Sequence, residues 1–209
     1  MGLWIDAWGA SVYPVESNPL SLAYQIELGK RRVPDQSIKT ANELLNVITE
    51  AESVKLQAWP FTGNAAKLIH RLSRISYLQL DIDKETTAAD FQALTAVGRI
   101  DSINLQGNAP DEAMMDALSN AQGVQELGIE STERVPDEGL AHLSRLNTLT
   151  KLELLFQGCK DDSLEHVIKI RSLRELTLPT SISSEAIKNF RAARPDVKVM
   201  TQELPQVSK

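Results

Sequence analysis

The sequence predicts an α/β fold: a right-handed solenoid in which a parallel sheet forms the concave face and helices form the convex face. Two observations lead to this prediction. Between Val135 and Leu154 the leucines first lie three residues apart, as on one face of a helix, and then two apart, as on one face of a strand. The same pattern returns at a nearly constant interval along most of the chain. Because one helix and one strand cannot bury their apolar faces alone, we expect copies of this unit to stack.

The repeat interval is clearest in the predicted strands. The second apolar residue of each strand follows the previous one after 24 or 25 residues, and after 21 in the last step. These residues are Leu56, Leu80, Leu105, Ile129, Leu154, Leu178 and Val199. Two positions before them stand Val54, Leu78, Ile103, Leu127, Leu152, Leu176 and Val197. Alternation along a strand sends both residues to the same face, which we expect to form the sheet side of the core.

Between the strands, apolar residues at helical spacing predict the side of each helix that packs on the sheet. The complete sets after residue 90 are Phe91/Leu94/Val97, Met115/Leu118/Ala121, Leu140/Leu143/Leu146, Leu164/Val167/Ile170 and Ile187/Phe190/Ala193. Asp111 and Asp137 precede two of these runs, and an aspartate at 161 or 162 precedes a third, which predicts helix caps. Arg194 is one of several cations near the predicted helix ends, where the helix dipole favours them, so we do not interpret them as a basic binding patch.

One domain is expected from 209 residues with 42% apolar content. The predicted organisation is an irregular N-terminal cap at residues 1–40, repeats at residues 41–200 and a C-terminal tail at residues 201–209. Within the cap, Trp4 and Trp8 are expected to cover the first repeat, and the alternation of Ile26 with Leu28 predicts a strand.

The repeats resemble those of leucine-rich repeat proteins. The pattern LxxLxL recurs from Leu149 to Leu154 and from Leu173 to Leu178, and the likeness covers roughly residues 40 to 200. The repeat length is similar to that of the ribonuclease-inhibitor and cysteine-containing types. The asparagine or cysteine that the family places in the turn after the strand occurs once, as Asn108, so the other turns depart from the family's pattern. The resemblance implies a horseshoe that binds a partner protein on its concave face.

Composition narrows the expected partners. The formal charge of -6 and the pI near 5.2 oppose nucleic-acid binding, which needs a basic face, and they suit a basic partner protein. Cys159 is the only cysteine, so no intrachain disulfide forms and a reducing compartment is favoured. No run is long enough to span a membrane, and the start of the chain does not match a signal peptide. We therefore expect a cytoplasmic monomer that requires no cofactor.

The candidate binding residues lie between the core leucines of the strands, where alternation sends them to the opposite face. Amides and acids occupy most of these positions, while Tyr77, Leu155 and Trp59 are expected to be exposed apolar anchors. The full set is Trp59, Tyr77, Gln79, Asp81, Asn104, Gln106, Glu126, Glu130, Glu153 and Leu155. We interpret this face as the binding surface of a non-enzymatic adaptor or inhibitor. The alternative is that the face is only solvated and binds no partner.

Two other functions are kept as alternatives. The chain could be a structural subunit that assembles through its N-terminal cap or its C-terminal edge strand. It could also be a metal-dependent enzyme, because His142 and His166 stand 24 residues apart at one repeat phase, although the sequence offers no third strong ligand. Cys159 is predicted to pack in the core, with a reactive thiol as the other possibility.

Overall fold

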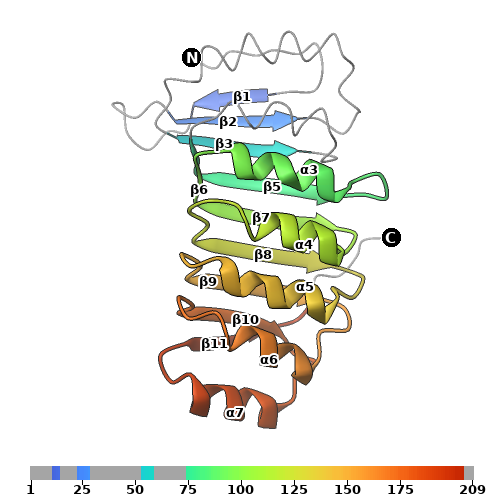
Figure 1. Ribbon diagram of the computed structural model, residues 1–209, viewed down its shortest axis with the longest axis vertical. Helices are drawn as coiled ribbons and strands as arrows, with labels where there is room; N and C mark the ends of the chain where they lie inside the picture. Colours follow the sequence, from blue (N-terminus) through green and yellow to red (C-terminus); the bar gives the residue numbers. More distant parts are fainter. Residues whose placement is uncertain (1–10, 15–22, 29–52, 59–73, 205–209) are drawn as a thin grey trace.

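The strands of the main sheet follow one another in space in the order of the sequence (Figure 1). A computed structural model describes residues 11–14, 23–28, 53–58 and 74–204, with side chains from residue 74 onward. Trp4 and Trp8, which were predicted to cover the first repeat, lie outside the described residues.

The nine-stranded sheet has the order β1-β2-β3-β5-β7-β8-β9-β10-β11. Its strands are β1 (Ser11–Pro14), β2 (Ala23–Leu28), β3 (Ser53–Ala58), β5 (Tyr77–Ile82), β7 (Ser102–Gly107), β8 (Glu126–Ser131), β9 (Lys151–Phe156), β10 (Glu175–Pro179) and β11 (Lys198–Gln202). All neighbours pair in parallel except β1, which is antiparallel to β2. Two short strands, β4 (Arg74–Ile75) and β6 (Arg99–Ile100), pair separately. The parallel sheet is confirmed, and β2 contains the strand predicted at residues 26–28.

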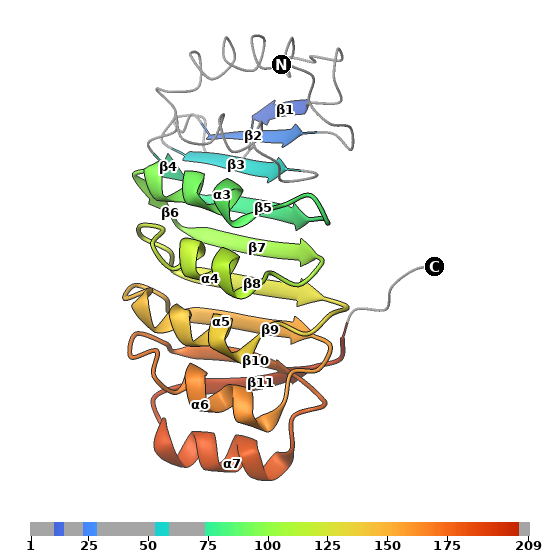
Figure 2. The ribbon, with the colours of Figure 1, turned by 45° about the vertical axis from the view of Figure 1, so that its right-hand side comes forward.

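Helical segments connect successive strands. They are α3 (Ala88–Gln92) with the 3₁₀ turn η1 (Ala93–Ala96), α4 (Glu112–Leu118), α5 (Asp137–His142) with η2 (Leu143–Arg145), η3 (Asp161–Ser163) with α6 (Leu164–Val167), and α7 (Ser184–Ala193). In both ribbon views α3 to α7 lie on the same side of the sheet (Figure 1, Figure 2). The architecture of the described residues is therefore one layer of helices on a parallel sheet.

The core lies between these two layers. The predicted inward strand residues from Leu78 to Val199 are all buried, as are the helix sets that begin at Phe91, Met115, Leu140 and Leu164. The prediction for α7 was partly wrong. Phe190 is buried, but Ile187 is only partly buried and Ala193 is exposed. Ile187 and its neighbour Ala186 both pack against the core, so only Ala193 of the predicted set lies outside the contact stripe of α7.

Only one of the predicted aspartate caps takes that role. Asp111 precedes α4, and its carboxylate accepts a hydrogen bond of 2.8 Å from the amide of Met114. Asp137 and Asp161 are instead the first residues of their helical segments. Their carboxylates accept hydrogen bonds from Ser163 and Ser183, which belong to the next helix start along the layer. These acids therefore link adjacent units.

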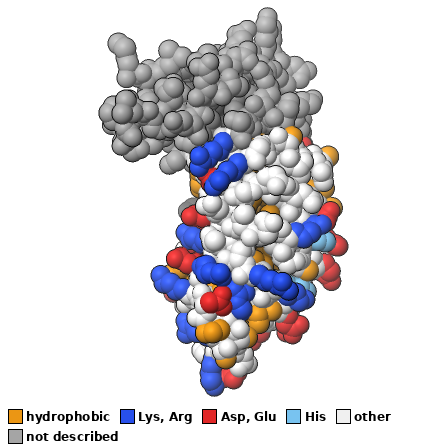
Figure 3. Space-filling view, turned by 60° about the vertical axis from the view of Figure 1, so that its left-hand side comes forward, with side chains coloured by type: hydrophobic (Ala, Val, Ile, Leu, Met, Phe, Trp, Pro, Cys, Tyr) orange, Lys and Arg blue, Asp and Glu red, His pale blue; other side chains and the backbone are white. Residues whose placement is uncertain are grey.

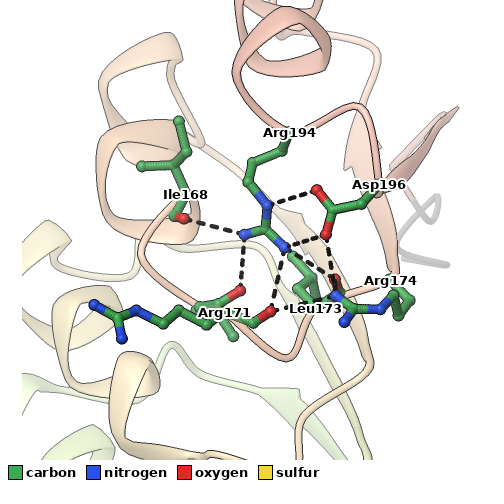
Figure 4. Close-up of polar contacts among 7 residues, drawn as sticks. Ile168, Arg171, Leu173, Arg174, Arg194 and Asp196 are labelled. Carbon is green, nitrogen blue, oxygen red and sulfur yellow. Dashed lines mark hydrogen bonds and ion pairs between the residues drawn. The ribbon is translucent and has the colours of Figure 1, made fainter.

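Arg194 links the last two units through its guanidinium (Figure 4). It donates to the backbone carbonyls of Ile168, Ile170, Arg171 and Leu173 at 2.9 to 3.5 Å, and it forms an ion pair with Asp196. Ile168 is the C-cap residue of α6 and the other three carbonyls belong to the segment that leads to β10, so this side chain satisfies backbone acceptors of the connection after the helix. Arg194 stands at the end of α7 as predicted, but its guanidinium bonds the preceding unit and not the end of its own helix. On the side of the molecule that lies at the left in Figure 1, Lys and Arg side chains have acidic side chains among them (Figure 3).

Cys159 belongs to the core, with 3% of its surface exposed. Burial raises the pKa of its thiol to about 11, although the Ser163 side chain opposes the shift. A thiol with that pKa is protonated near neutral pH and is a poor nucleophile. The predicted packing role is confirmed.

Candidate protein-binding face

Strand register arranges the predicted binding residues in rows across the sheet. We call the side opposite α3 to α7 the outer face. The first row, where the strands begin, contains Ser102, Glu126, Lys151, Glu175 and Lys198. The second contains Gln79, Asn104, Gly128, Glu153, Thr177 and Met200. The third contains Asp81, Gln106, Glu130 and Leu155.

The first row is close to electrically balanced. Glu126, Lys151, Glu175 and Lys198 follow one another on adjacent strands, so the sign of the charge alternates along the row. Adjacent strands lie about 4.8 Å apart, a spacing at which neighbouring opposite charges offset each other's field. Glu126 was predicted to belong to the acidic centre of the face. Its position beside Lys151 separates it from the other predicted acids.

The second and third rows bring together amides and acids. The Gln79 Nε2 group donates to Gln106 Oε1 at 3.2 Å, which ties the two rows together. Glu130 and Glu153 are half-buried and belong to adjacent strands. A half-buried carboxylate in such a row interacts with an incoming charge through less water than a fully exposed one, so the attraction is stronger.

Gly128 makes room for two of these side chains. A Cβ atom at this position would lie 2.6 Å from Oδ1 of Asn104 and 3.9 Å from Oε2 of Glu153. The Asn104 side chain therefore lies over the backbone of β8, in space that any larger residue at 128 would occupy. Gly128 thus leaves a notch in the row of side chains, which the amide of Asn104 fills, with the carboxylate of Glu153 on the other side.

Asp81 is the most unusual residue of the face. Only 6% of its surface is exposed, and neither carboxylate oxygen has a hydrogen-bond partner of normal geometry among the described residues. Burial raises the pKa of this carboxyl to about 6, and the nearby Gln79 side chain only partly opposes the shift. A buried charge without compensation is costly, so Asp81 destabilises the free protein when it is ionised.

Leu155 was predicted to be an exposed anchor, and this prediction was wrong. Its exposed fraction is 2%, although it is not part of the helix-side core cluster. Thr177 and Pro179, the neighbouring outer-face residues of β10, are buried as well. Alternation correctly places these residues on the outer face, but burial there increases toward the ends of β9 and β10, whereas Lys151, Glu153 and Glu175 stay half-buried. Tyr77 is half-buried, and Trp59 lies outside the described residues.

The structure does not assemble the alternative metal site. His142 lies 3.6 Å from a carboxylate oxygen of Glu112 and 3.6 Å from one of Asp116, both on α4. The two contacts involve different ring nitrogens, Nε2 toward Glu112 and Nδ1 toward Asp116, and one imidazole cannot direct both nitrogens at a single ion. Within residues 74–204 and the described strands before them, no three histidine, cysteine or acidic side chains are grouped as metal ligands would be. The helices in the same ranges are all too short or too polar to span a bilayer.

Comparisons with known proteins add no family. A scan against models of protein families finds no match to this chain, and a search of curated proteins finds none either. Sequence reasoning placed the described outer-face residues on the correct side of the sheet. It missed that Lys151 balances the charge of Glu126, and it missed the notch at Gly128. Both follow from aligning the strands at their core leucines and reading across them, because the register is the one that the leucine pattern implies.

Proposed function

We propose that this chain is a non-enzymatic protein-binding module that holds a basic partner on the outer face of its sheet. One observation carries the proposal: Asp81, Glu130 and Glu153 share two adjacent rows with the amides of Gln79, Asn104 and Gln106. Carboxylates favour lysine and arginine, and the amides add hydrogen bonds that fix orientation.

The exposure of the outer face supports this role. The strands of a parallel sheet are usually apolar on both sides, and helices therefore cover both of its faces. Here the described helices cover one side, and the other side keeps half-buried polar residues from β5 to β8 together with Glu153. Tyr77 at the edge of this region is amphipathic, as the anchors of many protein interfaces are.

The proposal includes the finer architecture. The LxxLxL spacing and the sequential strand order support leucine-rich repeats that coil as a right-handed solenoid, with the outer face as the concave surface. A cytoplasmic location goes with it, since Cys159 is a buried thiol.

Crosslinking tests which face binds. A photoreactive amino acid at Asn104, on the outer face, is expected to capture the partner from the native source. The same group at the exposed Glu138 of α5 is the matched control on the helix layer. Capture from position 138 but not from position 104 would contradict the proposal.

Binding kinetics then test the chemistry. With the captured partner immobilised, the double variant Glu130→Lys and Glu153→Lys is expected to slow association about tenfold at low salt, because it reverses the attraction. Glu126→Lys with Glu175→Lys makes the same change of charge in the balanced first row and is expected to have a smaller effect. Equal effects from the two pairs would show that net charge acts alone and that the rows do not matter.

A structural subunit is the second candidate, because β11 is the last strand of the sheet and leaves an edge. The structure partly blocks this edge. The Arg191 guanidinium donates to the carbonyl of Val199 at 2.9 Å, which occupies one of the groups a new strand would need. Light scattering that gives 23.1 kDa favours the binding module, and a stable dimer favours the subunit.

A further inference from the structure

The helix layer has a hollow of its own, between α6 and α7. Its volume is about 550 Å³. Leu164 and Ile168 from the α6 side, and Ala186 and Phe190 from α7, form its apolar wall. Figure 2 shows α7 beyond α6 at the end of the helix layer. The groove therefore lies on the opposite side of the sheet from the outer face.

Local packing explains why the groove lies here. Between α4 and α5 the helices approach closely, since a Cβ atom on Gly139 would lie 3.1 Å from Cγ of Met115. The segment before α7 is different: η3 is a 3₁₀ turn and α6 has only four residues, whereas α7 is a regular helix of ten residues. Unequal helices cannot match their side-chain ridges along their length, so space remains between them.

The walls of the groove are apolar and its rim is acidic. Ile168 and Ala186 remain partly exposed, so the wall presents apolar surface to solvent. The lining includes Asp161, Asp162, Glu165 and Glu185, and Lys169 is the one cation among the described lining residues. An apolar strip beside a concentration of one charge is typical of grooves that receive an amphipathic segment.

Most of these acids are available to a ligand. Asp161 is the exception, because it accepts hydrogen bonds from the amide and hydroxyl of Ser183 at 2.9 and 2.6 Å. Those hydrogen bonds lower the pKa of its carboxyl, so it adds a constant negative charge to the rim. Asp162 and Glu165 are exposed, and within the described part of the chain the one ion pair of Glu185 is with the exposed Lys188, at 3.6 Å. Such a pair contributes little and is easily exchanged for a better partner.

We propose that the groove between α6 and α7 binds an amphipathic segment of a partner protein, with leucine-like side chains on its wall and lysine or arginine at its acidic rim. The groove is separate from the outer face, so a partner that bound both surfaces would contact the module on two sides.

A designed peptide tests the proposal on the full chain. The probe is a helical peptide of leucine and lysine with the leucines on one face, and the controls are a scrambled version and a leucine–glutamate version. Two-dimensional NMR of the labelled protein is expected to show shifts at the amides of Ile168, Ala186 and Phe190 with the leucine–lysine helix, and much smaller shifts with both controls. Shifts confined to other residues, no binding, or equal binding of the glutamate version would overturn the proposal.

Charge reversal tests the rim. The triple variant Asp162→Lys, Glu165→Lys and Glu185→Lys is expected to lower the affinity for the probe peptide at least about tenfold. The matched control, Glu126→Lys, Glu138→Lys and Glu203→Lys, makes the same change in net charge at exposed positions outside the groove and is expected to weaken it much less. An equal loss of affinity in both variants would show that the peptide responds only to the net charge of the protein, and it would overturn the proposed site.

Filling the groove tests the wall without altering the core. Asn189 is exposed and lines the groove, so Asn189→Trp is expected to abolish the NMR shifts while the melting temperature is retained. Asn147→Trp, at an exposed position after η2, is the control and is expected to leave them intact. If the groove amides of the protein alone shift on concentration, a second copy is the occupant and the proposed partner segment is wrong.

Discussion

The two faces of the sheet share the same strands but differ in how strictly the sequence determines them. On the helix side, every predicted strand residue from Leu78 to Val199 is buried. On the outer face, Glu126 is exposed, Glu153 is half-buried and Leu155 is fully buried. From β5 onward the helix side is covered by α3 to α7, so alternation alone fixes burial there. On the outer face, burial varies with position along the sheet, which the alternation of a single strand does not encode.

The largest expected effect contrasts the two faces directly. Leu127→Asp and Leu152→Asp each place an unpaired charge in the core and are expected to cost more than about 4 kcal/mol, enough to unfold much of the protein. Glu126→Lys and Glu153→Lys on the same strands are expected to stay within about 0.5 kcal/mol. Thermal unfolding followed by circular dichroism measures both pairs. Equal damage would mean that the faces are reversed.

Leu155 tests where the distinction between the faces fails. Because its side chain is buried, Leu155→Ala is expected to cost ~2–5 kcal/mol of unfolding free energy, like a core leucine. Glu153→Ala, two residues earlier on the same face, is the control and is expected to cost little. Urea denaturation compares them. An unchanged midpoint for Leu155→Ala would restore the original prediction of an exposed anchor.

Asp81 sharpens the comparison through pH. Its folded-state pKa of about 6 lies above the ordinary value of 3.8, so the folded protein holds this proton more tightly than the unfolded chain. Ionisation therefore costs stability progressively between pH 3.8 and 6, and the cost is constant above that range. Asp81→Asn is expected to stabilise the protein by about 1–3 kcal/mol at pH 7 and to show no gain below pH 3.5.

Urea denaturation at several pH values measures this difference. A gain that is the same at pH 3.5 and pH 7 would mean that packing, and not ionisation, separates the two side chains. The same substitution is expected to weaken the binding of a basic partner, because asparagine lacks the charge that the partner neutralises. A residue that costs stability but promotes binding is consistent with a functional face.

The smallest expected effect concerns the notch at Gly128. Gly128→Ala would place a methyl group 2.6 Å from Oδ1 of Asn104, so the amide must move, at a cost of about 1 kcal/mol. Asn104→Ala removes the obstacle, and the double variant is expected to recover most of that loss. A double-mutant cycle by thermal unfolding gives the coupling. Purely additive effects would show that Asn104 does not lie over the glycine.

The repeat period and the core were predictable because they depend on one local rule, the placement of leucine at strand and helix spacing. The strand register followed from the same rule, and it puts Gln79, Asn104 and Glu153 in one row as the sequence suggested. Contacts between units were not predictable. Asp137 and Asp161 resemble helix caps in sequence, yet they bond to serines 26 and 22 residues ahead, because the next helix start brings a hydroxyl within reach.

Arg194 has a consequence for how the C-terminal end of the molecule opens. In a linear array, the terminal unit has a neighbour on one side only and is normally the first to fray. Here, detaching α7 would withdraw the donor from the carbonyls of Ile168, Ile170, Arg171 and Leu173 in the preceding unit. That unit would then lose protection together with its neighbour. Amide hydrogens on both sides of the junction should therefore exchange with solvent as a single cooperative block.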